Sequence, residues 1–159
     1  MAGSMKTNGT EELSRILGMC AAKAEDIASA ALYEGAGVVA DAYKKAAKNI
    51  KTGDRRKHNE PGGRKPTKEE KDAVVEGIGV SRFIKNGSEV DTMIGVAEGY
   101  AYPKGKKKAI KLLARSINHG TSFMQKQPVF RQAATQSRKA AQEAMVRKAD
   151  EMIEKITTK

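Results

Sequence analysis

The sequence contains no tryptophan and few aromatic residues of any kind, with three phenylalanines and four tyrosines among 159 residues. Proteins that bind single-stranded nucleic acid stack bases on aromatic side chains set among basic ones, so this scarcity disfavours such a function. The only cysteine, Cys20, cannot form an internal disulfide. Because it stands among small apolar residues, we expect a buried free thiol in a protein that folds inside the cell.

Long apolar stretches are also lacking. No run approaches the roughly 18 apolar residues of a membrane-spanning helix, and the first ten residues, MAGSMKTNGT, lack the apolar centre of a signal peptide. The sequence therefore predicts neither export nor contact with a membrane. Residues 1–9 are interpreted as a flexible N-terminus or a cloning remnant.

Patterns typical of enzymes are missing as well. His58 and His119 have no cysteine, carboxylate or nucleophile at a spacing that suits a metal site or a catalytic pair. The stretch GYAYPKGKKK, residues 99–108, resembles a phosphate-binding loop but has one residue too many between its glycines and Lys107 where serine or threonine is required. The stretch GIGVSR lacks the third glycine of a dinucleotide-binding motif. We predict no enzymatic activity, cofactor or metal.

Positive charge is abundant. Thirty Lys and Arg residues against nineteen Asp and Glu give a formal net charge of +11, which favours an anionic partner. One cluster lies in a predicted mobile loop, residues 51–66, rich in glycine and proline: Lys51, Arg55, Arg56, Lys57, Arg64 and Lys65. A second comprises Lys104, Lys106, Lys107, Lys108 and Lys111. Such clusters either contact DNA phosphates without reading sequence, face an acidic protein partner or are simply solvated.

Two long stretches are predicted to be helical. The first begins at Thr10, a residue type that caps helices, and runs to about Ile50, with an interruption expected at Gly18. Small apolar residues recur along it at helical spacing, which allows another helix to approach closely. Gly35 and Gly37 each cost about 1 kcal/mol relative to alanine in mid-helix, so they predict close packing within the chain or across a subunit interface.

The second long helix starts at Pro128, which suits a first turn, and extends to about Ile156. Its predicted apolar stripe consists of Phe130, Ala133, Ala134, Ser137, Ala141, Met145, Ala149, Met152, Ile153 and Ile156. Between the long helices, Thr67 and Glu70 match a capping box and predict a short helix that ends at Gly77 or Gly79.

A β-hairpin is predicted over residues 80–96, because apolar residues alternate on both sides of the turn signal Asn86-Gly87, with Val80 and Ile84 on the first strand. Residues 109–118, AIKLLARSIN, predict another short helix. The expected fold is α+β, with long N-terminal and C-terminal helices packed on a small antiparallel sheet, as one domain over residues 10–157. Two strands are marginally stable alone, so we expect a further strand from this chain or a neighbouring subunit.

The segment HGTSFMQKQPVF, residues 119–130, joins the last two predicted helices and is called the elbow below. Gly120 permits a turn, the hydroxyls of neighbouring residues tie down backbone groups, and proline fixes the direction of the last helix. Met124 and Phe130 are expected to anchor the elbow in the core. Its motif residues are Gly120, Thr121, Ser122, Met124, Gln127, Pro128, Phe130 and Arg131.

This series, followed by Ala133 and an alanine-rich helix, resembles the closing signature of the tail-component family of long-tailed phages, the Hong Kong ninety-seven gene-product-ten type. The order of TKEEKDAVVEGIGVSRF, the hairpin and AIKLLARSIN is similar to variants from phages of Gram-positive hosts, so the resemblance covers about residues 10–157. The chain departs from the family at Asn118, usually acidic, at Val129, usually aromatic, and at Gln132, commonly proline.

The resemblance implies a virion structural protein of the head-to-tail junction, a neck or tail-completion component that assembles as a ring of six copies. The implied partners are other neck proteins, namely a connector or stopper ring and the tail terminator or tail tube. Synthesis would take place in the host bacterial cytoplasm. A tail terminator that caps the tail tube, and a small basic protein that binds DNA without sequence specificity, stay open as alternatives. The basic loop then faces either genomic DNA in the channel or a protein partner.

Overall fold

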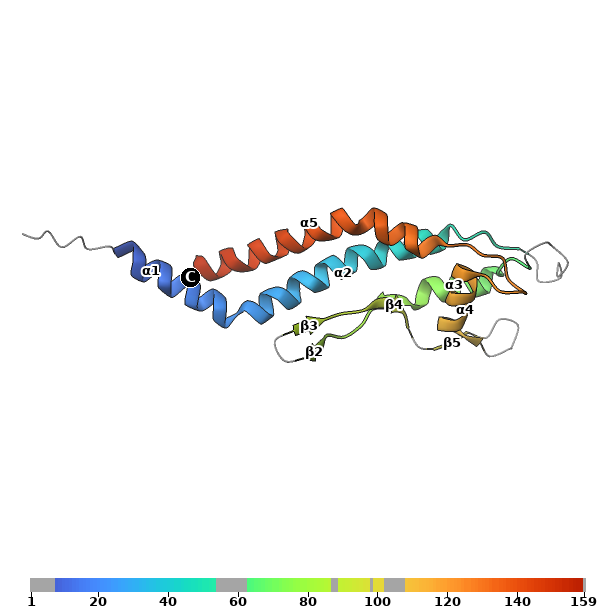
Figure 1. Ribbon diagram of the computed structural model, residues 1–159, viewed down its shortest axis with the longest axis horizontal. Coiled ribbons are helices and arrows are strands. Elements are labelled where there is room, and N and C mark those ends of the chain that lie inside the picture. The colour runs from blue at the N-terminus through green and yellow to red at the C-terminus, as the bar shows by residue number, and fades with distance from the viewer. Residues whose placement is uncertain (1–7, 54–62, 87–88, 98, 102–107, 159) are drawn as a thin grey trace, which may run out of the picture.

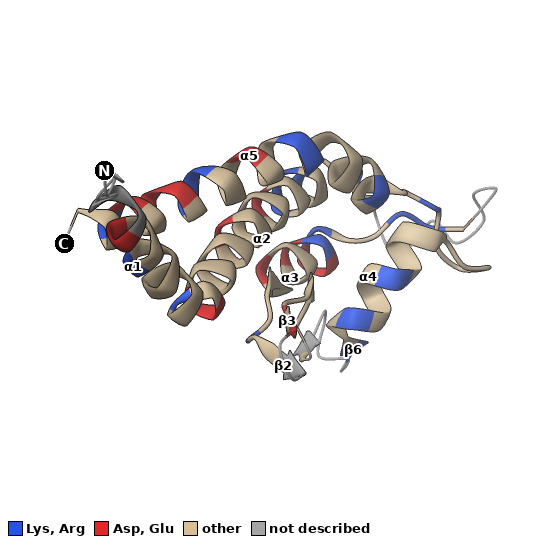
Figure 2. Cartoon of the chain, turned by 60° about the vertical axis from the view of Figure 1, so that its left-hand side comes forward, with Lys and Arg blue, Asp and Glu red and all other residues tan. Residues whose placement is uncertain are grey.

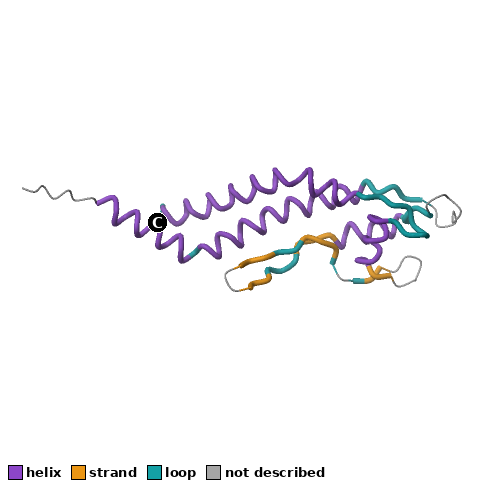
Figure 3. The backbone as a smooth tube through the Cα atoms, in the orientation of Figure 1, coloured by secondary structure: helices purple, strands orange, loops and turns teal. Residues whose placement is uncertain are grey.

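The computed structural model describes residues 8–53, 63–86, 89–97, 99–101 and 108–158. The predicted α+β class is confirmed, with two long helices and short antiparallel strand pairs (Figures 1 and 3). The helices are α1 (Asn8–Ala22), α2 (Ala24–Lys48), α3 (Lys68–Gly77), α4 (Ile110–His119) and α5 (Val129–Thr157). The strands are β1 (Ile78–Val80), β2 (Ile84–Asn86), β3 (Glu89–Asp91), β4 (Ile94–Val96), β5 (Tyr100–Ala101) and β6 (Lys108–Ala109).

The long helices α2 and α5 run antiparallel, side by side, along most of their lengths (Figure 1). Their facing surfaces consist largely of small side chains, which let the two backbones approach closely. Ser137 is buried among them, and its hydroxyl donates a hydrogen bond of 2.8 Å to the Ala133 carbonyl, so that its polar atom is satisfied. The buried alanines are Ala36, Ala40 and Ala47 of α2 and Ala133, Ala141 and Ala144 of α5.

The first predicted helix is divided at a different residue from the one expected. Gly18 lies inside α1, and the break falls at Lys23, whose φ of −109° and ψ of 8° leave the helical region. Thr10 already lies inside α1, which is described from Asn8 onward, so Thr10 is not its cap. A glycine in a helix costs only about 1 kcal/mol, which the remaining turns of α1 offset without a break.

Only one of the two mid-helix glycines of α2 is needed for close packing. A β-carbon at Gly35 would lie 2.3 Å from Met145 Cε and 2.5 Å from Met145 Cγ, because this side chain of α5 lies directly over the glycine. At Gly37 an added β-carbon would meet nothing within 4 Å. The predicted close approach is therefore within the chain and is specific to Gly35.

Alanine substitutions at these two glycines are expected to change stability in opposite directions. Gly37→Ala should raise the free energy of unfolding by about 0.5–1 kcal/mol, since alanine has the higher helix propensity and meets no obstruction. Gly35→Ala should lower it by about 1 kcal/mol, because overpacking against Met145 outweighs the same gain in propensity. Urea unfolding of the two variants measures both effects; an equal gain at Gly35 would contradict the close contact.

The predicted hairpin is present but carries a bulge. β1 pairs with β4 and β2 with β3, and the connecting register leaves three residues, 81–83, opposite two, 92–93. Ser81 joins the strands there, because its N–H donates to the Met93 carbonyl at 2.7 Å and its hydroxyl accepts from the Met93 N–H at 2.9 Å. Because of the extra residue, the side chains of β2 point to the opposite face of the hairpin from the one that simple alternation with β1 predicts. Phe83 therefore packs on Tyr33 of α2, with ring centroids 5.9 Å apart, while Ile84 is exposed.

The expected third strand does not join this hairpin within the part of the chain that the structure describes. β5 and β6 form a separate antiparallel pair, in which Tyr100 is opposite Ala109. The expectation was based on the weakness of a two-stranded sheet. Here the hairpin instead obtains its support from α2, which packs against β1, β3 and β4.

The main core lies where the second half of α2 meets α3, α4 and the elbow. α4 confirms the predicted short helix and buries Leu113, Ala114 and Ile117. Val74 of α3 and Met124 of the elbow are buried in the same cluster. The core therefore lies toward one end of an elongated molecule and holds that end's loops in place, whereas α1 and the C-terminus lie at the opposite end (Figure 1).

Candidate interface and its buried anchor

The elbow forms a compact turn at the end of α4. Gly120 has a φ of +77°, a value that favours glycine, and its N–H donates to the Ser116 carbonyl at 2.9 Å to close the helix. Thr121 and Met124 then exchange backbone hydrogen bonds of 2.9 and 3.2 Å, and the Thr121 hydroxyl accepts from the Phe123 N–H at 3.2 Å. Thr121 thus acts as predicted, while Ser122 is exposed.

Met124 is buried in the core cluster as expected, and the backbone around it pairs with the far end of the basic loop. The Arg64 N–H donates to the Phe123 carbonyl and the Gln125 N–H donates to the Arg64 carbonyl, both at 3.0 Å. The approach is so close that a β-carbon at Gly63, whose φ is +89°, would lie 2.5 Å from backbone atoms of Phe123 and Met124. The loop and the elbow are therefore joined by their main chains.

Gln127 fastens the near end of the same loop. Its side-chain oxygen accepts from the Lys51 N–H at 2.8 Å, and its side-chain nitrogen donates to the Lys51 carbonyl at 2.9 Å. Pro128 was predicted to lie in the first turn of this helix, but it occupies the N-cap position, one residue before α5 begins at Val129. The Phe130 N–H donates to the Asn118 side-chain oxygen at 3.4 Å, and the Phe130 ring packs on Tyr43 with centroids 5.4 Å apart.

The role expected for Arg64 was wrong. Arg64 was assigned to a solvated basic loop that faces DNA or a partner, but it is buried and forms a bidentate ion pair with Glu70 of α3, at 2.7 and 2.8 Å. Lys108 Nζ binds the same carboxylate at 2.6 Å. The carboxylate oxygens of Glu70 accept hydrogen bonds from both cations, and this pairing is what allows the charged side chains to be buried. The sequence gives no local sign of this pairing, because Lys108 is 38 residues away from Glu70.

Glu70 has a second task in the capping box of α3. Its N–H donates to the Thr67 hydroxyl at 3.2 Å, and its side chain accepts from the Thr67 N–H at 3.0 Å, which confirms the predicted motif. Burial raises the pKa of this carboxyl, but the hydrogen bonds from Arg64, Lys108 and Thr67 lower it by more. The resulting pKa is about 2, compared with an ordinary value of 4.5. Glu70 therefore stays ionised at any physiological pH.

This ion cluster holds the C-terminal ends of two lysine-rich segments, the loop over residues 51–66 and the segment that ends at Lys108, at one end of the molecule. The Gly53 N–H donates to the Pro66 carbonyl at 3.0 Å, which closes the base of the loop between residues 53 and 66. Lys108, itself a member of the second lysine cluster, begins β6. Of the predicted basic residues, Lys51 is exposed and Lys65 half-buried. Arg55, Arg56 and Lys57, as well as Lys104, Lys106 and Lys107, lie outside the described residues.

A charge pattern along the chain distinguishes this end from the other. Residues 99–142 contain ten Lys and Arg and no Asp or Glu, whereas residues 8–43 contain six Asp and Glu and two Lys and Arg. In Figure 2 the charged positions of α4 are all basic, and several of those on neighbouring α3 are acidic. The acid-free segment is a signal that overall net charge conceals. It makes α4 and the elbow a basic part of the described structure.

Little else in the described residues suggests chemistry. They contain no group of three or more His, Cys, Asp and Glu residues placed to hold a metal ion. His119 is exposed on α4 beside Asn118, and His58 lies outside the described part of the chain. None of the helices described is long and apolar enough to cross a membrane. Comparison of the chain with protein-family models, curated proteins and solved structures finds no match.

Proposed function

We propose that this chain is a structural protein of a bacteriophage virion, a neck or tail-completion component that assembles as a ring at the head-to-tail junction. The observation that carries the proposal is the elbow motif set in a basic end of an elongated molecule. There the elbow's backbone and Gln127 hold both ends of the basic loop. The alternative role in the same virion is that of a tail terminator, which caps the tail tube.

The basic end suits a position beside DNA that has to move. Phosphate contacts by Lys and Arg carry no sequence information and weaken with salt, so they attract DNA in a channel without holding it at one place. Exposed apolar side chains lie on the same end, with Phe123 71% and Leu112 63% exposed. Large apolar residues find no partner on a phosphate backbone, so they favour a surface that also contacts protein.

A freely diffusing DNA-binding protein is the second candidate, because the acid-free segment over residues 99–142 is an electrostatic footprint for duplex DNA. Affinity for duplex DNA at several salt concentrations separates the two. Such a protein should bind duplex tightly at low salt and lose affinity steeply as salt rises. A junction protein should bind a connector or tail-tube ring and show little affinity for DNA alone.

Deletion of this reading frame from its native phage or prophage is the direct test, with particles examined by electron microscopy. We expect full heads beside unattached tails, and overlong tails would favour the terminator role. Intact virions at normal yield would contradict a place at the junction. Complementation with the triple variant Arg55→Glu, Arg56→Glu, Lys57→Glu should restore folded protein but not joining or DNA retention. Full infectivity of that variant would remove the basic loop from the mechanism.

A further inference from the structure

Two exposed surfaces at opposite ends of the molecule have complementary character. The first, called the α4 surface, is a groove of about 380 Å³ between α4 and the elbow. Leu112 and Phe123 line it, and both are among the most exposed large apolar residues of the described chain. Arg64 and Lys108 line the same groove. Since they share the single carboxylate of Glu70, the buried cluster leaves one net positive charge beneath the groove, and exposed Arg115 lies on the same helix.

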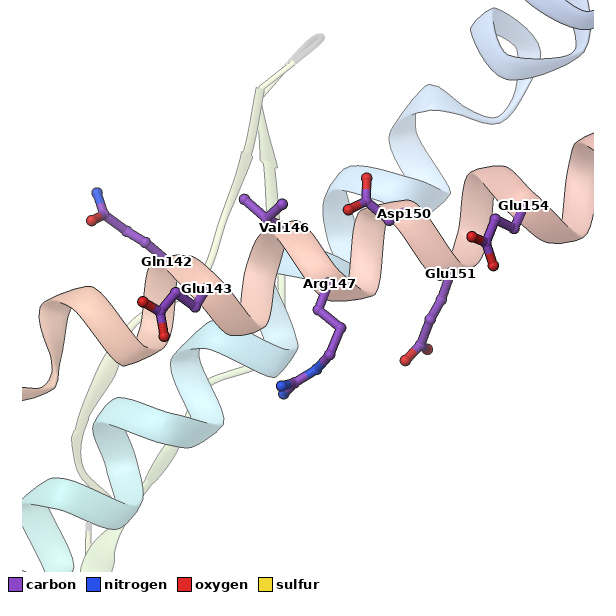
Figure 4. A pocket seen from close by; sticks show the side chains of 7 residues that line it. All are labelled: Gln142, Glu143, Val146, Arg147, Asp150, Glu151 and Glu154. Atoms are coloured by element: carbon purple, nitrogen blue, oxygen red, sulfur yellow. The ribbon is translucent and has the colours of Figure 1, made fainter.

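The second, called the α5 surface, lies on the C-terminal half of α5. Two rows of side chains run along the helix there, and Figure 4 shows Val146 between Gln142 and Asp150 in one row, with Glu143, Arg147 and Glu151 in the other. Val146 is 61% exposed, and Ile153, two turns further on, is exposed as well. The depression over this face, about 510 Å³, also has Glu154 at its edge.

The α5 surface is negative even after its internal ion pairs are counted. Glu143 approaches Lys139 at 3.9 Å and Glu151 approaches Lys148 at 3.2 Å, both as exposed pairs along the helix. Asp150 and Glu154 form no side-chain ion pair with a described residue. Arg147 offsets one of these two negative charges, so the surface keeps one net negative charge. The neighbouring α1 and first part of α2 add to the negative field, because residues 8–43 carry four more acidic than basic side chains.

We infer that the α4 surface of one copy binds the α5 surface of a second copy, so that the chain self-associates head to tail. Each surface combines exposed apolar side chains with a net charge, which is positive on the α4 surface and negative on the α5 surface. Opposite net charges of this kind select a partner and its orientation. A duplex would match the positive charge but would leave Leu112 and Phe123 against phosphates. The two surfaces lie at opposite ends, so the contact is heterologous and leaves both free surfaces available for further copies.

This inference deepens the proposed function, since a ring is built from repeated heterologous contacts, but it concerns purified protein alone. Sedimentation of the wild-type chain up to about 0.1 mM should show concentration-dependent association that weakens as salt is raised. A wild-type chain that stays monomeric throughout would overturn the inference. Association that rises with salt would overturn it too, because an electrostatically matched contact is screened.

Charge reversal of each surface tests which residues form the contact. The pair Leu112→Asp with Phe123→Asp makes the α4 surface acidic, because both residues line the groove. The pair Val146→Lys with Asp150→Lys makes the α5 surface basic. Each pair should raise the dissociation constant about tenfold or more. All four residues are exposed, so circular dichroism and melting temperature should match the wild type. Leu17→Asp is the matched control, because Leu17 is 60% exposed on α1, outside both surfaces, and should leave association unchanged.

Mixing the two reversed proteins provides the decisive measurement. Each then offers an intact surface to the other, and the two reversed surfaces are again opposite in charge, so association should return to within about threefold of the wild type. No recovery, or an equal loss with Leu17→Asp, would overturn the assignment of these surfaces. Loss of duplex binding by the reversed α4 surface with unchanged self-association would assign it to DNA instead. Such results leave the proposed function standing, since the particle experiment tests that separately.

Discussion

Replacement of Glu70 by Gln is expected to lower the free energy of unfolding by about 3–5 kcal/mol, one of the largest effects of any single substitution in this protein. The amide preserves the shape of the side chain but leaves the buried guanidinium of Arg64 without a counter-charge. It also weakens the tie to Lys108 and the capping box of α3. Chemical denaturation of the variant and the wild type at pH 7 measures the difference.

Glu69→Gln is the matched control, since Glu69 lies in the same first turn of α3 but is exposed. Its loss should stay near 0.5 kcal/mol, the size of a surface charge near a helix N-terminus. The double variant Arg64→Met with Glu70→Leu should recover part of the loss, because no unpaired charge is left in the interior except the half-buried Lys108. Equal effects of Glu69→Gln and Glu70→Gln would show that the ion cluster does not stabilise the fold.

The wild type and the Glu70→Gln variant should also respond differently to acid. A carboxyl whose folded pKa is lowered stabilises the fold above its unfolded pKa and loses that contribution as pH falls through the folded value. For Glu70 the window runs from about 4.5 down to about 2, and the shift corresponds to roughly 3 kcal/mol. The difference in stability between wild type and Glu70→Gln should therefore be constant from pH 7 to 5 and shrink toward pH 2. A difference that does not change with pH would contradict the lowered pKa.

Gly63→Ala is the second substitution with a large expected effect, about 2–4 kcal/mol of lost stability. Its φ of +89° is unfavourable for any residue with a β-carbon, and the added carbon would lie 2.5 Å from the backbone of Phe123 and Met124. Backbone atoms cannot turn aside as a side-chain end can, so either the loop or the elbow has to move. The paired amides of Arg64 and Gln125 should then lose protection from hydrogen exchange.

Gly53→Ala provides the comparison at the other end of the same loop. There the added β-carbon would lie 3.0 Å from Lys65 Cβ, a contact that a shift of a few tenths of an ångström relieves, and we expect a change within about 0.5 kcal/mol. Normal exchange protection at Arg64 in Gly63→Ala would show that the elbow and the loop do not depend on their close backbone approach. A loss of stability as large in Gly53→Ala would point to loop entropy instead.

Features that depend on neighbouring residues were predictable from the sequence. The capping box of Thr67 and Glu70 lies within one turn, and the apolar faces of α4 and β4 follow from simple periodicity. The burial of Met124 was also predicted, whereas the sequence did not show that the adjacent Phe123 would be exposed. The position of the first helix break at Lys23 was not, because a glycine nearby offered the stronger local signal.

Features that depend on distant partners were not predictable in this way. Arg64 looks like any other cation of a polar loop until Lys108 and Glu70 are brought beside it. The exposure of Ile84 follows from one extra residue in the hairpin, which the alternating pattern conceals, because a bulge reverses the facing of every later residue on its strand. Nothing in the sequence therefore indicated that Arg64 is buried and paired with Glu70.

The contact between Gly35 and Met145 has a consequence for motion. The facing surfaces of α2 and α5 are rows of alanines that look alike at successive turns, so small steps of one helix along the other cost little contact. A long side chain over a glycine breaks this translational symmetry, because a shift by one turn would drive Met145 into a neighbouring β-carbon. Met145 thus fixes the axial position of α5 along α2, and with it the distance between the two ends of the molecule.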